Sequence, residues 1–392
     1  MERNIETKCL HLESSEGRIE NYGAISFPIF QTATYAHAGV GGSTGYDYSR
    51  LQNPTREHLE QTVAQIEGGT NAYALSSGMA AITMLFEIFS PGDHIIADSD
   101  LYGGSIRLFD NVSKKNDLKF TSINCWCDDI EQFIRPETKA IYVETPTNPM
   151  MNVTDIAAVS AIAKKHGLLL IVDNTFLSPY FQNPLALGAD VVIHSGTKFL
   201  GGHNDTLAGF IVTSREDIAE KLSFLIKTVG SGLAPFDSWL ILRGIKTLGI
   251  RMEKAEKNAI EIANWLKTQE HITKVIYPGL PEHPGYEIMK KQARGFGSML
   301  TFRTDSRDFA LEILNKVKMI KFAESLGGVE TLITYPTTQT HADVPEEIRE
   351  KNGITDTTLR LSVGIENVSD LIAELDSVFR EIGSELNGRE KS

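Results

Sequence analysis

Three short segments of the sequence combine residue types that could bind an anion, pair with a cation and supply a nucleophilic amine. Each lies at the end of a short apolar run or directly after one: Ser76–Met79, Asp173 and Ser195–Lys198. Apolar runs of this length are typical of buried parallel strands. Because ligands bind at the carboxyl ends of the strands in open α/β sheets, we expect the three segments to lie together.

The first two segments have a binding interpretation and an ordinary one. Ser77 is a suitable N-cap, and the free N–H groups of Gly78 and Met79 at the start of the following helix would form an anion site. Asp173 ends a buried strand, where a carboxylate is costly unless it meets a cation. A plain capped turn at Ser77 and an Asx turn or N-cap at Asp173 stay open.

Lys198 follows the next apolar run, DVVIH (190–194), with two hydroxyl residues beside it. Ser195 and Thr197, with Gly201-Gly202, could bind phosphate while the amine forms a covalent bond. A surface lysine is the ordinary alternative. The S-x-x-K signature of penicillin-binding enzymes would also require S-D-N and K-T-G, which this sequence lacks. A P-loop would place its glycines before the lysine.

Taken together, the segments match one ligand, pyridoxal 5'-phosphate. Its phosphate would bind at residues 78–79 with Ser195 and Thr197. Its ring nitrogen would stay protonated against Asp173, and its aldehyde would form a Schiff base with Lys198.

The elements that must position these residues alternate regularly over about 170 residues. Apolar runs are separated by amphipathic segments such as 153–166, which predicts βαβ units and a mainly parallel sheet. From about residue 235 the pattern becomes less regular, with one long helical segment at 236–268, and predicts a smaller α+β domain. We predict an N-terminal arm at 1–50, a cofactor-binding domain at 51–245 and a C-terminal domain at 246–392.

Composition excludes several classes of protein. The 392 residues carry a net charge of −13, which argues against nucleic acid and anionic membrane as partners. No apolar run approaches the ~20 residues of a membrane span, and the charged start of the chain is unlike a signal or transit peptide, so we expect a cytoplasmic protein. Cys9, Cys125 and Cys127 are too few for a disulfide framework, and no second pair completes a metal site.

The motifs also resemble a known family. Eight segments in matching order resemble the cystathionine synthase/lyase family, the Cys/Met-metabolism branch of fold-type-I pyridoxal-phosphate enzymes, over nearly the full length. They read YDYSRLQNPT (46–55), SSGMAA (76–81), LYGGS (101–105), ETPTNP (144–149), VDNTF (172–176), HSGTKFLGGH (194–203), AESLGG (323–328) and LRLSVGIE (359–366). The resemblance implies an α/β fold with a mainly parallel seven-stranded sheet and a smaller α+β C-terminal domain.

The resemblance further implies roles by position. Lys198 would hold the cofactor and move protons, and Asp173 would face the ring nitrogen. Tyr102 would stack on the ring, with a phenol pKa lowered by neighbouring cations so that it can act as a base. Tyr48 and Arg50 would reach the phosphate in a neighbouring subunit, as expected of a homotetramer built from two dimers.

Four further residues are implied to bind substrate, and two positions narrow the reaction. Arg360 would clamp the α-carboxylate, with Asn148 and Ser325 helping to hold the ligands. Glu324 could meet the distal amino group of cystathionine or cysteine, or act only as a nearby charge. Methionine γ-lyases carry a cysteine where this chain has Gly104.

The longer segments STGYDYSR, GGHNDTLAGF and GGVETLITYPTTQTH resemble bacterial cystathionine γ-synthases that also act as O-acetylhomoserine thiolyases. We therefore expect γ-replacement on an O-acylated homoserine by cysteine or sulfide. The alternatives are a cystathionine γ- or β-lyase, then a methionine γ-lyase, and last a cofactor-binding regulator without turnover.

Overall fold

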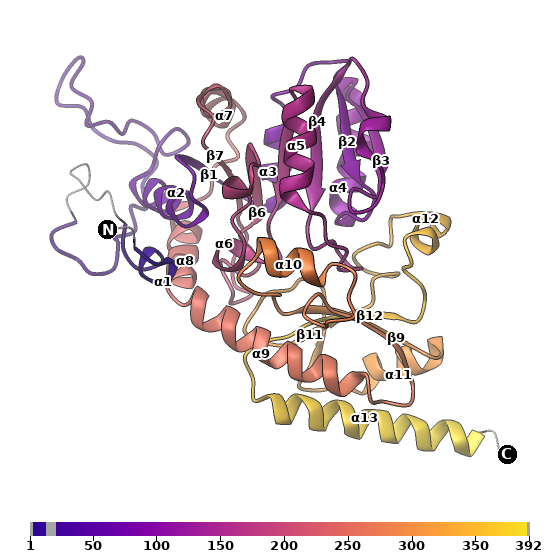
Figure 1. Ribbon diagram of the computed structural model, residues 1–392. Coiled ribbons are helices and arrows are strands. Elements are labelled where there is room, and N and C mark those ends of the chain that lie inside the picture. Colours follow the sequence, from indigo (N-terminus) through magenta and orange to yellow (C-terminus); the bar gives the residue numbers. More distant parts are fainter. Residues whose placement is uncertain (1–2, 13–20, 390–392) are drawn as a thin grey trace.

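The computed structural model describes residues 3–12 and 21–389, and side chains only as far as residue 385 within the last helix. Two sheets organise these residues, a large one above and a smaller one below in the view of Figure 1. A pair of consecutive helices, α8 and α9, runs down one side and connects the two layers of the molecule.

The large sheet has seven strands in the order β1-β7-β6-β5-β4-β2-β3. Only β7 runs antiparallel to its neighbours, so the predicted mainly parallel seven-stranded sheet is confirmed. Its strands are β1 (Asn71–Leu75), β2 (His94–Asp98), β3 (Lys119–Ile123), β4 (Thr138–Glu144), β5 (Leu169–Asp173), β6 (Val191–Ser195) and β7 (Gly209–Thr213). The edge strand β3 was not expected from the sequence, because it has no continuous apolar run and only its last residue, Ile123, is buried.

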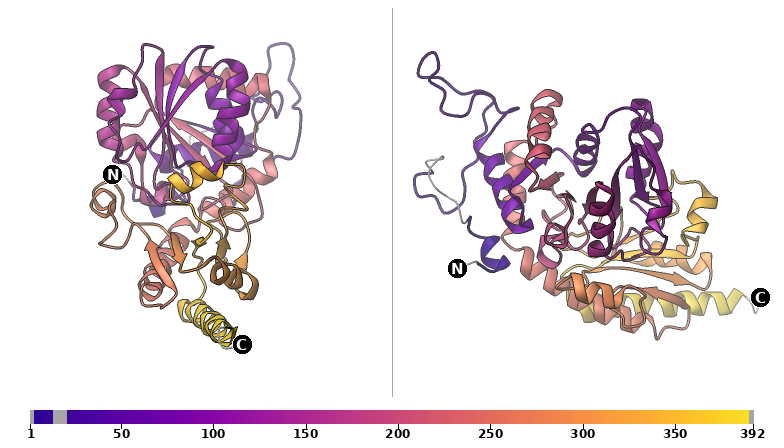
Figure 2. Two further views of the ribbon diagram at one scale, coloured as in Figure 1. Left: turned by 90° about the vertical axis from the view of Figure 1, so that its right-hand side faces the viewer. Right: turned by 45° about the horizontal axis from the view of Figure 1, so that its top comes forward.

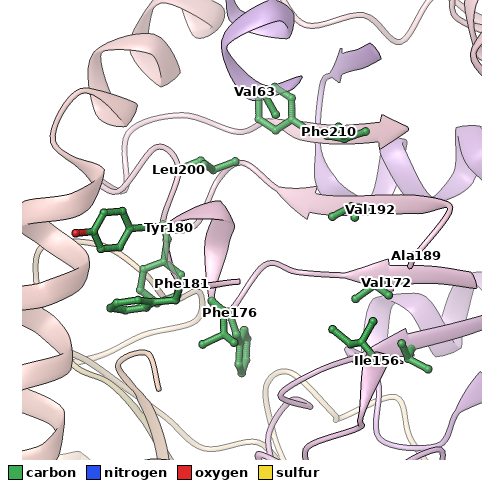
Figure 3. Close-up of a cluster of buried hydrophobic side chains, with 14 of the residues drawn as sticks. Val63, Ile156, Val172, Phe176, Tyr180, Phe181, Ala189, Val192, Leu200 and Phe210 are labelled. Atoms are coloured by element: carbon green, nitrogen blue, oxygen red, sulfur yellow. The ribbon is translucent and has the colours of Figure 1, made fainter. Parts of the chain in front are cut away.

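Both faces of this sheet are covered, and alternate residues of each strand enter different cores. In β4, Ile141 and Val143 join one cluster, whereas Ala140 and Tyr142 join the other. Figure 3 shows part of the first cluster, with Val172 and Val192 from adjacent strands side by side. The helices of this region are α2 (Pro54–Glu67), α3 (Gly78–Phe86), α4 (Gly103–Arg107), α5 (Ile156–His166), α6 (Ser178–Phe181) and α7 (Glu216–Val229). Short 3₁₀ turns at Ser113–Asn116, Ile130–Phe133 and Pro184–Leu187 and a π-turn at Leu108–Val112 connect them.

The prediction of one continuous helix at 236–268 is wrong. The structure has α8 (Pro235–Ile245) and α9 (Leu248–Leu266), interrupted at Lys246–Thr247. The apolar period continues through the break, which is why the sequence pattern did not reveal it. Leu248 and Met252 of α9 pack in the core of the large sheet, whereas Ala259 to Leu266 pack in the core of the small one.

The C-terminal sheet has five strands in the order β10-β11-β12-β9-β8. The strands are β8 (Ile272–Ile276), β9 (Met299–Thr304), β10 (Lys321–Phe322), β11 (Leu332–Thr334) and β12 (Thr358–Ser362). Helices α10 (Tyr286–Gln292), α11 (Arg307–Lys316), α12 (Glu346–Lys351) and α13 (Val368–Arg389) accompany it. This mixed sheet with helices confirms the smaller α+β region.

Before α2, the described residues contain one short helix, α1 (Ile5–Lys8), which lies beside α2, and a loop within residues 21–50 that projects from the body of the molecule (Figures 1 and 2). It exposes large apolar side chains, including Ile25, which is 97% exposed. We keep the name arm for residues 1–50. Among the described residues, no helix has the length and apolar character to span a membrane.

Candidate active site

A cavity of about 300 Å³, here the inner cavity, lies where the carboxyl ends of β4, β5 and β6 face the C-terminal sheet. Its walls include most of the site residues expected from the sequence. These are Ser77, Gly78, Met79, Tyr102, Asn148, Asp173, Ser195, Thr197, Lys198, Glu324, Ser325 and Arg360. The fold therefore brings together side chains that lie as far apart in sequence as Ser77 and Arg360.

One end of the inner cavity is formed by the start of α3. The Ser77 hydroxyl caps this helix by accepting a hydrogen bond from Ala80 N at 3.1 Å, which leaves the first N–H groups, at Gly78 and Met79, without a partner inside the helix. A Cβ on Gly78 would lie 2.9 Å from the Ser195 Cβ, so only glycine allows this close approach to β6. Uncommitted amides at a helix start, with the Ser195 and Thr197 residues beside them, fit a phosphate group.

Two carboxylates lie side by side at the ends of adjacent parallel strands, since Glu144 pairs with Asp173 in the sheet. Burial raises the pKa of both, and for Glu144 the neighbouring Asp173 raises it further. Asp173 accepts hydrogen bonds from Thr175 N at 3.0 Å and Thr175 Oγ1 at 2.6 Å, which aim the carboxylate. Among the described residues no lysine or arginine forms a salt bridge with Asp173, so the pair fits a ligand that carries a positive charge.

Lys198 lies between the large sheet and the C-terminal sheet. Its Nζ donates to Ser325 Oγ at 2.7 Å. Burial, followed by the nearby Arg360 cation, lowers the pKa of Lys198 to about 8. Ser325 adopts a φ of 81°, a left-handed conformation that is uncommon outside glycine. An amine with this pKa is partly unprotonated near neutral pH, as nucleophilic and proton-transfer chemistry requires.

Arg360 is the largest fully buried side chain and reaches the inner cavity from β12. It donates to Asn148 Oδ1 at 2.9 Å, Ser325 O at 2.7 Å and Thr334 Oγ1 at 3.0 Å. Its Nε has no hydrogen-bond partner among the described residues. Burial lowers the pKa of Arg360 to about 10, so the guanidinium remains charged and fits a carboxylate.

Tyr102 stands at the start of α4, where its N–H donates to Glu144 Oε2 at 3.0 Å. Its side chain is 40% exposed and lines the inner cavity. A Cβ on Gly104 would lie 2.5 Å from the Tyr102 ring and 3.0 Å from Met79 Sδ. The ring therefore packs over a glycine that no larger residue can replace without moving it.

Tyr48 and Arg50 do not line the inner cavity of their own chain. Tyr48 is exposed, and the Arg50 guanidinium lies 5.5 Å from the centre of the Tyr48 ring while donating to the Lys227 carbonyl. Their predicted contact with the phosphate of a neighbouring subunit stays a prediction. Gly201-Gly202, considered above for phosphate binding, is also outside the cavity and packs against α8 and Arg251.

Sequence reasoning missed several residues of the inner cavity, including Glu144, Thr175, Leu207 and Thr340. Glu144 had a usable signal, because it ends the buried strand next to the one that Asp173 ends. Thr175 could have been found as the residue two positions after Asp173 in an Asx turn. Leu207 and Thr340 lie in loops without a distinctive pattern, and only the fold brings them to the site.

The cavity thus holds separate places for a phosphate, a cationic ring nitrogen, an aldehyde and a carboxylate. The phosphate place is at Gly78, and the place for the ring nitrogen is at the Asp173–Glu144 pair. Lys198 provides the place for the aldehyde, and Arg360 that for the carboxylate. Bound pyridoxal phosphate with an amino acid attached presents these same groups, so the residues present fit that cofactor.

Comparison with known proteins agrees with this geometry. Residues 6–380 match the family model described as Cys/Met metabolism PLP-dependent enzyme. The chain is 47% identical to a cystathionine beta-lyase of Lactococcus lactis subsp. cremoris over 379 residues, covering 96% of this chain and 99% of that protein. It is 46% identical to a cystathionine gamma-synthase/O-acetylhomoserine (thiol)-lyase of Bacillus subtilis over 383 residues, covering 97% and 98%.

Among solved structures, the chain is similar to cystathionine gamma-lyase from Lactobacillus plantarum complexed with L-serine. The two share 44% identity with a TM-score of 0.93, and the match covers 96% of this chain and 99% of the other. The similar proteins thus carry three different reaction names at nearly equal sequence identity. Sequence similarity alone therefore does not decide which of the three reactions this chain catalyses.

Proposed function

The chain belongs to the Cys/Met metabolism PLP-dependent enzyme family, and from this premise we propose that it catalyses γ-replacement on an O-acylated homoserine. The nucleophile is cysteine, giving cystathionine, or sulfide, giving homocysteine. Its relatives share trans-sulfuration chemistry with pyridoxal phosphate. The choice of replacement within that group depends on the second reactant.

The observation that carries this choice is a second cavity beside the first. This outer cavity of about 980 Å³ shares Thr197, Leu207, Glu324 and Ser325 with the inner one. The rest of its wall includes Asn204, Asp205, Thr206, Asp237, Lys321 and Glu330. A replacement reaction must bring a second molecule to the γ-carbon of the first, and the adjoining cavities offer room for both.

Glu324 stands on the wall that the two cavities share, next to Ser325. A carboxylate there suits the amino group of cysteine, or the distal amino group of cystathionine, by charge pairing. Methionine has no such group. This chain also has Gly104 in place of the cysteine of methionine γ-lyases, and this glycine packs tightly under the Tyr102 ring. Both features support a cystathionine-handling enzyme.

The side chains divide the work. Bound pyridoxal phosphate supplies an aldehyde for the substrate amine and a ring that withdraws electrons from the α-carbon. Arg360 holds the α-carboxylate, and Asp173 holds a proton on the ring nitrogen. Lys198 Nζ accepts the α-proton, returns it to another atom of the bound substrate and cofactor, and is then free to accept the β-proton, while Ser325 Oγ keeps this amine in place.

The arm supports an assembly of subunits. Tyr48 and Arg50 lie together outside the inner cavity of their own chain, and the arm exposes apolar side chains that a partner subunit would cover. In the proposed homotetramer, each arm completes the phosphate site of the neighbouring subunit.

A second candidate, a cystathionine γ- or β-lyase, is favoured by the position of Glu324. Cystathionine itself would place one amino acid in the inner cavity and the other at Glu324. The names of similar proteins include both lyases. The two candidates differ in whether a second molecule enters, so they differ in their substrates.

The deciding experiment is a paired assay of the cofactor-loaded protein, followed by mass spectrometry. One reaction contains O-acetylhomoserine and cysteine, and the other contains cystathionine alone. We expect rapid cystathionine formation in the first and slow breakdown in the second. Faster breakdown than synthesis would overturn the synthase assignment, and the keto acid released would identify a β- or γ-lyase.

A further inference from the structure

The turn that carries Lys198 ends in carbonyl groups that its own backbone cannot satisfy. Gly201 N donates to Gly196 O at 2.9 Å, and Gly202 N donates to Lys198 O at 2.7 Å. The carbonyls of Phe199 and Leu200 come next. Like the last carbonyls of any helical turn, they need hydrogen-bond donors from outside the turn.

Arg251 of α9 supplies these hydrogen bonds. Its Nη1 donates to Phe199 O at 2.7 Å, and its Nη2 lies 3.5 Å from Leu200 O. The same guanidinium donates to Gly244 O at 2.8 Å and to Thr247 Oγ1 at 3.2 Å, at the break between α8 and α9. One planar group with five donors therefore ties the Lys198 turn to the helix break.

Arg251 has no carboxylate partner among the described residues, although it is only 6% exposed. Burial lowers the pKa of Arg251 to about 10, and the group remains a cation at neutral pH. A buried cation is costly unless its hydrogen bonds are satisfied. Here backbone carbonyls and one threonine hydroxyl satisfy them, so the position of the guanidinium and the position of the turn depend on each other.

Glycines make the contact possible. Gly202 has a φ of +72°, and a Cβ there would lie 2.0 Å from Arg251 Nη1. A Cβ on Gly244 would lie 2.2 Å from the Gly201 carbonyl oxygen. The Leu200 side chain of the same turn is buried in the core of the large sheet (Figure 3). The backbone of the turn is thus fixed within narrow limits.

We propose that Arg251 is a positioning residue for Lys198: it fixes the backbone after the lysine to the break between α8 and α9, so that Nζ meets the reacting carbon. Ser325 holds the amine from the opposite side. This inference rests on the role given to Lys198 in the proposed function. A misplacement of about 1 Å in such a group can lower the rate about 100-fold.

A purely structural role for Arg251 would give a different result, and the chain offers a matched control. Arg303 of β9 donates to the Gly353 carbonyl, and Gly353 has a φ of +80° with a Cβ position 2.8 Å from Arg303 Nη2. This pair also joins a guanidinium to the backbone at a glycine of positive φ, but it does not contact the Lys198 turn. Arg303→Met and Gly353→Ala therefore report loss of stability alone.

The experiment compares Arg251→Met, Arg251→Lys and Gly202→Ala with those two controls, all loaded with pyridoxal phosphate. We expect Arg251→Met and Gly202→Ala to lower kcat at least about 10-fold with KM within about twofold. They should also shift the pH midpoint of the visible band of the bound cofactor. Arg251→Lys should lie between wild type and Arg251→Met, and the controls should lose thermal stability but keep kcat and the midpoint.

Wild-type kcat and pH midpoint in Gly202→Ala and Arg251→Lys would overturn the proposal, even where Arg251→Met fails to fold. Equal changes in the controls would overturn it as well. Lys198→Ala, measured in parallel, separates the two levels of inference. If Lys198→Ala kept both the visible band and turnover, the proposed function itself would fail. If Lys198→Ala lost them, the proposed role of Lys198 would stand, and the arginine variants would then decide whether Arg251 positions it.

Discussion

The inner cavity and the arm differ in how far side chains find contacts within this one chain. In the cavity, Lys198 and Arg360 each have hydrogen-bond partners from distant parts of the same chain. In the arm, Ile25 and Tyr22 are almost fully exposed, and Tyr48 and Arg50 lie outside the lining of the inner cavity. If the proposed assembly is right, we expect the chemistry to depend on one subunit and the retention of the cofactor to depend on the arm of the next.

The largest expected effect is that of Lys198→Ala, which removes the covalent anchor and the proton acceptor together. Turnover should fall by at least about 1,000-fold, because general-base catalysis alone contributes two to four orders of magnitude. Steady-state product formation measures the loss. Lys139→Ala, an exposed position in β4, should behave like wild type. Normal activity in Lys198→Ala would contradict the assignment of the cavity as the site of chemistry.

Arg360→Lys tests whether the cavity recognises a carboxylate by a fork of two donors. Lysine keeps the positive charge, but a single ammonium group cannot donate hydrogen bonds to Asn148 and to a substrate carboxylate in the geometry of the guanidinium. We expect kcat/KM to fall about 100-fold, mainly through KM for the amino-acid substrate, since charge-assisted hydrogen bonds contribute about 1.5–3 kcal/mol each. Arg303→Lys on the adjacent strand is the control. An unchanged KM would show that the α-carboxylate binds elsewhere.

Arg50→Ala tests the arm. Loss of one cation at a phosphate should weaken pyridoxal-phosphate binding about 10-fold while leaving kcat of the fully loaded enzyme nearly unchanged. Equilibrium dialysis measures cofactor binding, and Arg215→Ala, an exposed arginine paired with Asp217, serves as the control. A large fall in kcat at saturating cofactor would place Arg50 in the chemistry and remove the contrast between the two regions.

The smallest effect concerns stability without cofactor. The pKa of Lys198 is lowered to about 8 in the folded chain, so between that pH and the unfolded value near 10.5 the unfolded state binds more protons. Stability therefore rises with pH across this window, by about 0.7 kcal/mol per pH unit at pH 8, where half a proton is released. Urea unfolding of wild type and Lys198→Met at several pH values measures the difference. The same slope in both proteins would contradict the buried amine.

Much of the cavity was predictable because it depends on strand ends, which local patterns reveal. Ser77, Asp173 and Lys198 each follow an apolar run, and parallel strands bring such ends to one edge. The break at Lys246–Thr247 and the role of Arg251 were not predictable, since both depend on contacts across the chain. Gly201-Gly202 shows the same limit. The sequence revealed the two glycines, but the need for Gly202 comes from its close contact with the Arg251 guanidinium, about 50 positions away.

One consequence follows from the way α9 is shared. Its first turns belong to the core of the large sheet and its last turns to that of the small sheet. Neither core can lose its structure without removing packing from the other through a rigid, continuous helix. The two lobes should therefore melt as a single cooperative unit, giving one calorimetric transition although the chain is large enough for two.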